Sequence, residues 1–177
     1  LKCSAINTYG ALGIGNNISA NTPQSVNLGT GRTAVAIAGI GWAGSFCAIL
    51  NDGSLKCWGY NGWGLLGIGN NSDQNTPQSV ELGTDRTAAA IFGGGVHTCA
   101  ILDDGLIYCW GYGGEGQLGT GSQPDMSDYR SLTPVEVSIP AGRTAASISV
   151  GTRHNCAVLD NASIYCWGEG LYGNLGD

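Results

Sequence analysis

The sequence predicts an all-β fold of repeated, stacked β-hairpins, and three observations support this prediction. A pattern in which two cysteines ten positions apart flank a turn and precede Trp-Gly occurs at residues 47–59, 99–111 and 156–168. Flanking motifs recur with it, so the chain is periodic at about fifty residues, which is the signature of a repeat architecture. Glycine accounts for 31 of the 177 residues, as a fold with many tight turns requires.

The flanking motifs keep their spacing except at two insertions. Arg-Thr-Ala begins at positions 32, 86 and 143, and each copy follows a Thr-Pro pair whose proline lies nine positions earlier. The stretch around Trp42 carries two extra residues relative to the second copy, and residues 123–130 add five. Insertions in repeat proteins usually form loops, often on the binding face.

Each cysteine-flanked segment predicts a hairpin. In the first copy, Asn-Asp-Gly at residues 51–53 suits a three-residue loop that ends with glycine in the left-handed region. That loop places Cys47 opposite Cys57 and Ile49 opposite Leu55, all on one face of the strand pair. The other face is also largely apolar, so we expect the hairpin to lie between two neighbouring sheets. In the third copy Ala162 replaces the glycine, which favours a change of turn type or register, but we expect a Cys156–Cys166 bridge to hold the strands in place.

The six paired cysteines predict cross-strand disulfides, because opposed residues lie about as close as a disulfide requires. The predicted pairs are Cys47 with Cys57, Cys99 with Cys109, and Cys156 with Cys166. Each bridge would stabilise the fold by about 3 kcal/mol in the chain-entropy model. Such pairs favour an extracellular location or the lumen of the secretory pathway.

Two alternatives to the disulfides are buried reduced thiols and a zinc site. A zinc site is disfavoured because His97 and His154 have no counterpart in the first copy and no closely spaced cysteine pair exists. We expect no metal and no cofactor. Cys3 has no mate ten positions upstream, so we expect it to be unpaired or to bond another chain. The chain starts and stops within the pattern, as a window onto a longer array would.

Composition excludes some partners and favours others. The net charge is −6 with no basic stripe, so nucleic acid is not an expected partner. No apolar stretch is long enough to cross a membrane. Asn-x-Ser sequons at Asn17, Asn70 and Asn161 are candidate glycosylation sites, and they fit a secreted glycoprotein.

Residues 97–111, 116–121 and 133–135 together resemble the repeat of the regulator of chromosome condensation (RCC1) family. The resemblance implies a β-propeller with blades of four antiparallel strands. The chain would form one array, 1–177, of about three and a third repeats, with approximate boundaries 1–46, 47–98, 99–155 and 156–177. It would be a partial ring or an open, intermolecular array. The founding member of the family is a guanine-nucleotide exchange factor that also binds chromatin.

The residues that break the repeat are the best candidates for binding a partner. Those singled out are Trp42, Trp63, Tyr129 and Arg130, with Tyr60, Tyr112 and Tyr172 as further aromatic candidates. Arginines at 32, 86 and 143 occur in every repeat, which is typical of scaffold residues. We also expect structural roles for His97 and His154.

No nucleophile–base pair or carboxylate pair stands out, so the sequence predicts a protein that is not an enzyme. The favoured function is a secreted structural or protein-interaction scaffold, built from disulfide-stapled repeats within a larger assembly. It would bind proteins or associate with itself, and glycans are further candidate partners. Two alternatives stay open: a regulator of a small GTPase, like the founding member, and a carbohydrate-binding receptor ectodomain.

Overall fold

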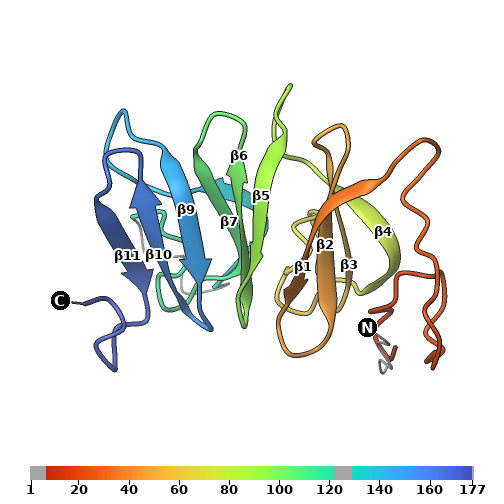
Figure 1. Ribbon diagram of the computed structural model, residues 1–177. Coiled ribbons are helices and arrows are strands. Elements are labelled where there is room, and N and C mark those ends of the chain that lie inside the picture. Colours follow the sequence, from red (N-terminus) through yellow and green to blue (C-terminus); the bar gives the residue numbers. More distant parts are fainter. Residues whose placement is uncertain (1–6, 122–128, 177) are drawn as a thin grey trace.

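The computed structural model describes residues 7–121 and 129–176, and this part of the chain contains strands but no helix (Figure 1). The strands are β1 (Ala34–Ile40), β2 (Ser45–Leu50), β3 (Leu55–Gly59), β4 (Gln74–Val80), β5 (Ala88–Gly93), β6 (His97–Leu102), β7 (Ile107–Tyr112), β8 (Arg130–Glu136), β9 (Ala145–Val150), β10 (His154–Leu159) and β11 (Ile164–Gly168).

The strands form three antiparallel sheets, ordered β1-β2-β3-β4, β5-β6-β7-β8 and β9-β10-β11. The three sheets stand side by side, and β5 contacts both β1 and β9 (Figure 1). These three strands are therefore the innermost strands of consecutive propeller blades. The predicted fold class is confirmed as an open arc of blades. Each sheet begins at the Arg-Thr-Ala motif, one strand before its cysteine hairpin.

The hairpin register follows the sequence prediction. Cys47 lies opposite Cys57, and Ile49 lies opposite Leu55. The second and third hairpins repeat this register. All three cysteine pairs are disulfide-bonded, each with its Cα atoms 4.1 Å apart.

The third turn keeps its type, so the change favoured by Ala162 does not occur, and the strands stay in register as expected. Ala162 has φ of 65°, close to the 78° of Gly53 and 79° of Gly105. Its backbone N–H donates to the Leu159 carbonyl at 2.9 Å, as in the other two copies. The two strands joined by the disulfide fix both ends of the turn. Within the turn, the Asn161 side-chain oxygen accepts a hydrogen bond from the Ser163 N–H at 3.1 Å.

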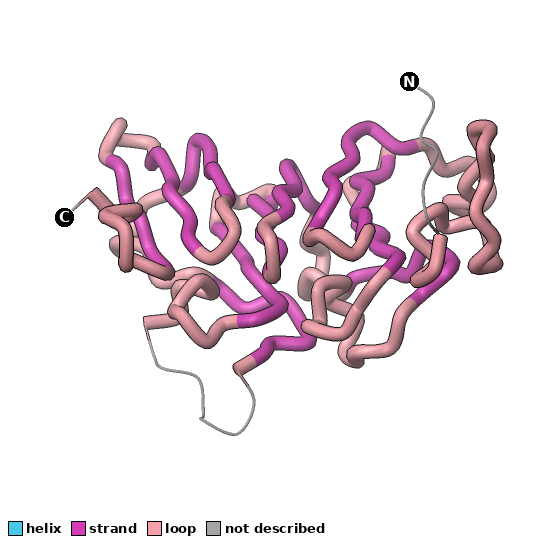
Figure 2. Tube along the Cα trace, turned by 90° about the horizontal axis from the view of Figure 1, so that it is seen from below, coloured by secondary structure: helices cyan, strands magenta, loops and turns pink. Residues whose placement is uncertain are grey.

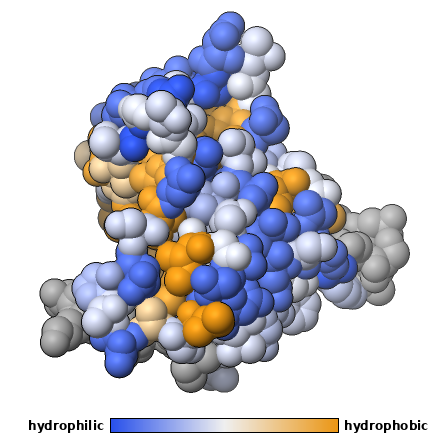
Figure 3. Space-filling model, turned by 90° about the vertical axis from the view of Figure 1, so that its right-hand side faces the viewer, coloured by the Kyte–Doolittle hydropathy of each residue, from blue (hydrophilic) through white to orange (hydrophobic). Residues whose placement is uncertain are grey.

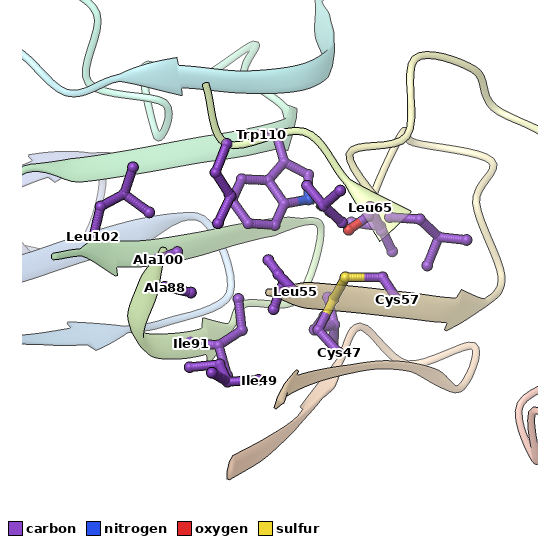
Figure 4. Close-up of a cluster of buried hydrophobic side chains, with 14 residues drawn as sticks. Cys47, Ile49, Leu55, Cys57, Leu65, Ala88, Ile91, Ala100, Leu102 and Trp110 are labelled. Atoms are coloured by element: carbon purple, nitrogen blue, oxygen red, sulfur yellow. Dashed lines mark hydrogen bonds between the residues drawn. A yellow bond between two sulfur atoms is a disulfide. The ribbon is translucent and has the colours of Figure 1, made fainter. Parts of the chain in front are cut away.

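Two hydrophobic clusters lie between the sheets. The first joins the first hairpin to the second sheet, where Ile49 and Leu55 pack with Ile91, Leu102 and Trp110 (Figure 4). The second cluster lies on the other face of the second sheet, against β9 and β10. The second hairpin is therefore covered on both faces, as predicted.

The tryptophan of each hairpin links its blade to the preceding repeat. The indole N–H of Trp58, Trp110 and Trp167 donates to the carbonyl of Ala11, Leu65 and Gln117, at 3.0, 2.9 and 3.1 Å. A glycine lies against each ring. At Gly67, for example, a Cβ atom would lie 2.7 Å from the Trp110 indole nitrogen, so a larger residue would displace the ring.

The repeated arginines close the hairpin tips. Arg32 pairs with Asp52 at 2.6 Å. Arg86 pairs with Asp103 at 3.3 Å, and Arg143 with Asp160 at 3.5 Å. Each partner lies on the hairpin tip of the arginine's own sheet, which agrees with a scaffold role.

Candidate functional site: the loop face

The antiparallel strand order gathers one set of connections at one end of the sheets. We call this end the loop face, and Figure 2 views the molecule from this side. Its described residues are 41–44, 60–73, 94–96, 113–121, 129 and 151–153. The hairpin tips, with their arginine–aspartate pairs, lie at the opposite end. Any partner of the loop face therefore meets the segments in which the repeats differ most.

Three aromatic residues from two connections meet on the loop face. The rings of Trp63 and Tyr112 lie 5.3 Å apart, and those of Tyr112 and Tyr129 lie 6.3 Å apart. We call these three residues the aromatic cluster. Trp63 is 42% exposed and Tyr129 is 39% exposed. Arg130 extends back to this site, and its Nη1 donates to the Gly62 carbonyl at 2.9 Å.

The structure thus brings together three of the four residues that the sequence singled out for binding. Trp63 belongs to one repeat and the adjacent residues Tyr129 and Arg130 to the next, with 68 positions between Gly62 and Arg130. They meet because β3 and β7 end at the same face. The rest of the insertion, residues 122–128, lies outside the described residues. Of the further aromatic candidates, Tyr60 packs edge-on against Tyr9, with ring centroids 5.1 Å apart, and Tyr172 is 85% exposed.

Trp42 lies elsewhere on the loop face, beside the ends of the innermost strands. Its side chain is 84% exposed. It lines a shallow hollow of about 320 Å³, whose other walls come from the turns after β1, β5 and β9. We call this the inner hollow. Its lining includes Gly41, Gly94, Gly151 and Thr152, and its surface is mainly polar.

The glycines of the inner hollow allow neighbouring turns to touch. The Gly41 N–H donates to the Gly94 carbonyl at 2.8 Å, and the Gly95 N–H donates to Gly151 at 3.4 Å. A Cβ on Gly94 would lie 2.7 Å from the His97 ring, and one on Gly151 would lie 2.6 Å from the His154 ring. Two imidazoles therefore support the floor of the hollow. Of the residues that line the hollow, the sequence singled out only Trp42, because the glycines are typical of ordinary turns.

His97 belongs to a buried network between the second and third sheets. Its Nε2 lies 2.8 Å from the Asn155 side-chain oxygen, and the Asn155 amide donates to the Gln117 carbonyl at 2.8 Å. Burial lowers the pKa of His97, and the hydrogen bond that its ring donates to the Asn155 side-chain oxygen opposes this effect only in part. The contacts give His97 a structural role.

The three sequon asparagines are exposed. Asn17 and Asn70 lie on connections, whereas Asn161 lies at the tip of the third hairpin, at the other end of the sheets. The Asn161 side-chain oxygen accepts from the Ser163 hydroxyl at 2.6 Å. Cys3 lies outside the described residues. Within the described ranges, no group of three or more His, Cys, Asp or Glu side chains could hold a metal ion, and no helix could span a membrane.

The fold and the hairpins define a class of protein, the disulfide-stapled β-propeller repeat protein. The model of the regulator of chromosome condensation (RCC1) repeat matches residues 52–101 and 104–158, and a second model of that repeat matches 88–117 and 145–174. The chain belongs to the RCC1 repeat family.

Relatives and solved structures agree with this membership. The ultraviolet-B receptor UVR8 of Arabidopsis thaliana is 31% identical over 95% of this chain, which spans 37% of the receptor's length. Human WBSCR16 superposes with a TM-score of 0.79 at 21% identity, over 98% of this chain and 44% of that chain.

Two further solved structures share the fold. Yeast RCC1 (Prp20), solved bound to Kap60, gives a TM-score of 0.65 at 23% identity, over 77% of this chain and 32% of Prp20. The ectodomain of the Physcomitrella patens receptor kinase CR4 gives 0.53 at 21% identity, over 92% of this chain and 36% of that chain. The chain therefore spans well under two thirds of the proteins it resembles.

Proposed function

We propose that this protein is a non-catalytic protein-interaction scaffold that works in an oxidising compartment and binds its partners through the loop face. The observation that carries the proposal is the aromatic cluster. It places Trp63 and Tyr129, both partly exposed, on a rigid base formed by two sheets. Tryptophan, tyrosine and arginine are the residues most enriched at the centres of protein interfaces.

The disulfides support the choice of compartment. Cross-strand bridges occupy the same position in all three hairpins, and such bonds persist outside the cytosol and nucleus. The exposed sequons agree with passage through the secretory pathway, and we propose Asn17, Asn70 and Asn161 as glycosylation sites. The CR4 ectodomain shows that this fold also occurs in a receptor ectodomain.

Self-association is a second part of the proposal. On the first sheet, Val35 and Ile37 of β1 are 66% and 64% exposed, and Figure 3 shows hydrophobic patches on that side of the molecule. On the third sheet, Ile164 of β11 is 68% exposed. Elsewhere in the arc, aliphatic residues of the hairpins are covered by a neighbouring sheet. A second copy could supply that cover, and an intermolecular bond through Cys3 would accompany it.

The main alternative is a regulator of a small GTPase, to which the family resemblance points. Such a protein works in a reducing compartment, where stable disulfides are rare. The intact mass of the native protein separates the two functions. We expect a gain of about two mass units per bridge on reduction, with additional mass that enzymatic deglycosylation removes. Free thiols at all six paired positions and no attached sugar would move the intracellular regulator to first place.

A double variant tests the loop face itself. Trp63→Ala with Tyr129→Ala removes the exposed part of the aromatic cluster, and we expect loss of partner binding. Self-association through the first and third sheets, followed by analytical ultracentrifugation, should be unchanged. Tyr172→Ala is the matched control, because that ring is 85% exposed and is not one of the three rings of the cluster. Retention of every interaction by the double variant would show that the partner binds elsewhere.

A further inference from the structure

The inner hollow has three properties that scaffolding does not explain. An indole that is 84% exposed, that of Trp42, stands at its edge. Its surface is mainly polar, yet no charged side chain lines it. Its polar groups come from glycine backbone and from the exposed residue Thr152. A volume of about 320 Å³ lies at the lower end of the range for small-molecule sites.

These properties specify the chemistry of a ligand. Absence of charge in the lining disfavours phosphates, carboxylates and ammonium groups, which are recognised by charged side chains. Backbone carbonyls and a hydroxyl recognise a ligand rich in hydrogen-bonding groups. The indole offers a flat apolar surface with a polar tip. A pyranose ring has both features, since hydroxyl groups surround a flat face of C–H bonds.

We propose that the inner hollow is a binding site for a neutral saccharide, with Trp42 stacking on a sugar ring and the backbone of the three turns meeting its hydroxyl groups. The lining is held in place before any ligand arrives. The bonds from Gly41 to Gly94 and from Gly95 to Gly151 tie the three turns together. A site that is already ordered loses little entropy on binding.

The site also explains the location of one insertion. The first repeat has two more residues than the second between Arg-Thr-Ala and the first hairpin cysteine. The β1–β2 turn at residues 41–44 is therefore longer than its counterpart at 94–96, and Trp42 lies within it. In the corresponding turns the residues that line the hollow are smaller, namely Gly94, Gly95, Gly151 and Thr152. The longer turn thus adds an aromatic wall to the hollow, and the backbone of the other two turns forms the floor.

The proposal goes beyond the protein-interaction role, because the inner hollow shares no lining residue with the aromatic cluster. A variant of one site therefore leaves the other unchanged. Trp42→Ala addresses the hollow, and Trp63→Ala is its matched control on the same face. Both side chains are exposed, so neither change should prevent folding, which circular dichroism and the melting temperature check.

The experiment is a titration of the purified protein with neutral oligosaccharides of three to six units, including gluco-, manno-, xylo- and N-acetylglucosamine series. Binding is followed by calorimetry and by tryptophan fluorescence. We expect at least one series to bind, and Trp42→Ala to weaken it by about tenfold or more through loss of the stacked ring. Trp63→Ala should bind like the wild type, and Thr152→Val should bind more weakly than the wild type.

Three results would overturn the proposal. If no neutral series binds the wild type at millimolar concentration, the hollow is not a saccharide site. If Trp42→Ala binds as tightly as the wild type, the sugar binds elsewhere. If a proline-rich peptide binds in a Trp42-dependent manner while no sugar does, the ligand class is wrong. None of these results affects the protein-interaction proposal, which rests on Trp63 and Tyr129.

Discussion

The second and third sheets carry the same hairpin in different surroundings. In the second sheet Cys99, Cys109 and Trp110 are all fully buried, because sheets cover both faces of the hairpin. In the third sheet the matching residues Cys156, Cys166 and Trp167 are only half-buried. The backbone register and the disulfide are nevertheless the same.

The junctions that join the sheets differ as well. Between the first and second sheets, the Thr98 hydroxyl and the Trp110 indole both donate to the Leu65 carbonyl, at 2.8 and 2.9 Å. Between the second and third, Asn155 takes the place of the threonine, and its side-chain oxygen also meets His97. Hairpin geometry is thus a local property, whereas burial and protonation behaviour depend on the neighbouring sheet.

The largest expected effect comes from the buried tryptophan. Trp110→Ala leaves a cavity between two sheets and removes one of the two hydrogen bonds to the Leu65 carbonyl, and it should lower the free energy of unfolding by about 3–5 kcal/mol. Trp167→Ala removes a half-buried ring, so it should lower the free energy of unfolding by clearly less. Urea unfolding of both variants measures the difference. Equal losses would mean that the environment of the hairpin does not set the contribution of its tryptophan.

The second prediction concerns pH and the junction around His97. Burial lowers the pKa of His97 in the folded protein below its ordinary value of 6.5. Between the lowered pKa of the folded protein and 6.5, the unfolded chain binds more protons than the folded protein does. The stabilisation from neutral His97 is therefore complete above pH 6.5 and declines as the pH falls below that value. Hydrogen exchange should show the third sheet opening first as the pH is lowered.

The control for this pH effect is His97→Gln, which cannot be protonated. Below pH 6.5 this variant should show a smaller difference in hydrogen-exchange rate between the second and third sheets than the wild type does. In the first sheet the residue that matches His97 is Ser45, whose hydroxyl donates to the Tyr60 carbonyl at 2.6 Å. An unchanged pH profile in His97→Gln would assign the effect to another group.

The smallest expected effect lies at the hairpin turns. Ala162→Gly relieves a left-handed alanine and should stabilise the protein by about 1 kcal/mol. Gly105→Ala should destabilise it, because φ there is 79° and a Cβ would lie 2.6 Å from that of Thr144 in the next sheet. Melting temperatures of the two variants test this. A destabilised Ala162→Gly variant would mean that the alanine makes a contact of its own.

Much of the fold could be predicted from the sequence because its determinants are local. The loop length fixes which residues oppose each other, so the pairs Cys47–Cys57 and Ile49–Leu55 followed from counting positions. The sequence also predicted that neighbouring sheets cover both faces of the hairpin, because alternate residues point to opposite faces and both sets are largely apolar. The third turn was the exception. An isolated Ala162 disfavours φ of 65°, but the joined strands and the Asn161 side chain outweigh that preference.

The candidate sites were less predictable, because they are assembled from repeats far apart in the chain. Sequence could flag Trp63, Tyr129 and Arg130 as departures from the pattern, but not that they meet. It could flag Trp42, but not the hollow beside it, since Gly94 and Gly151 are typical of turns in any chain.

The sequence by itself determined the repeat, the hairpin register, the disulfide pairing and the family, because each depends on spacing within one copy. Only the tertiary structure decided which hairpin is buried, which histidine is desolvated and which loops share a face. Those outcomes depend on the stacking of neighbouring sheets. The same hairpin therefore becomes a fully buried core in the second sheet and a half-exposed surface in the third.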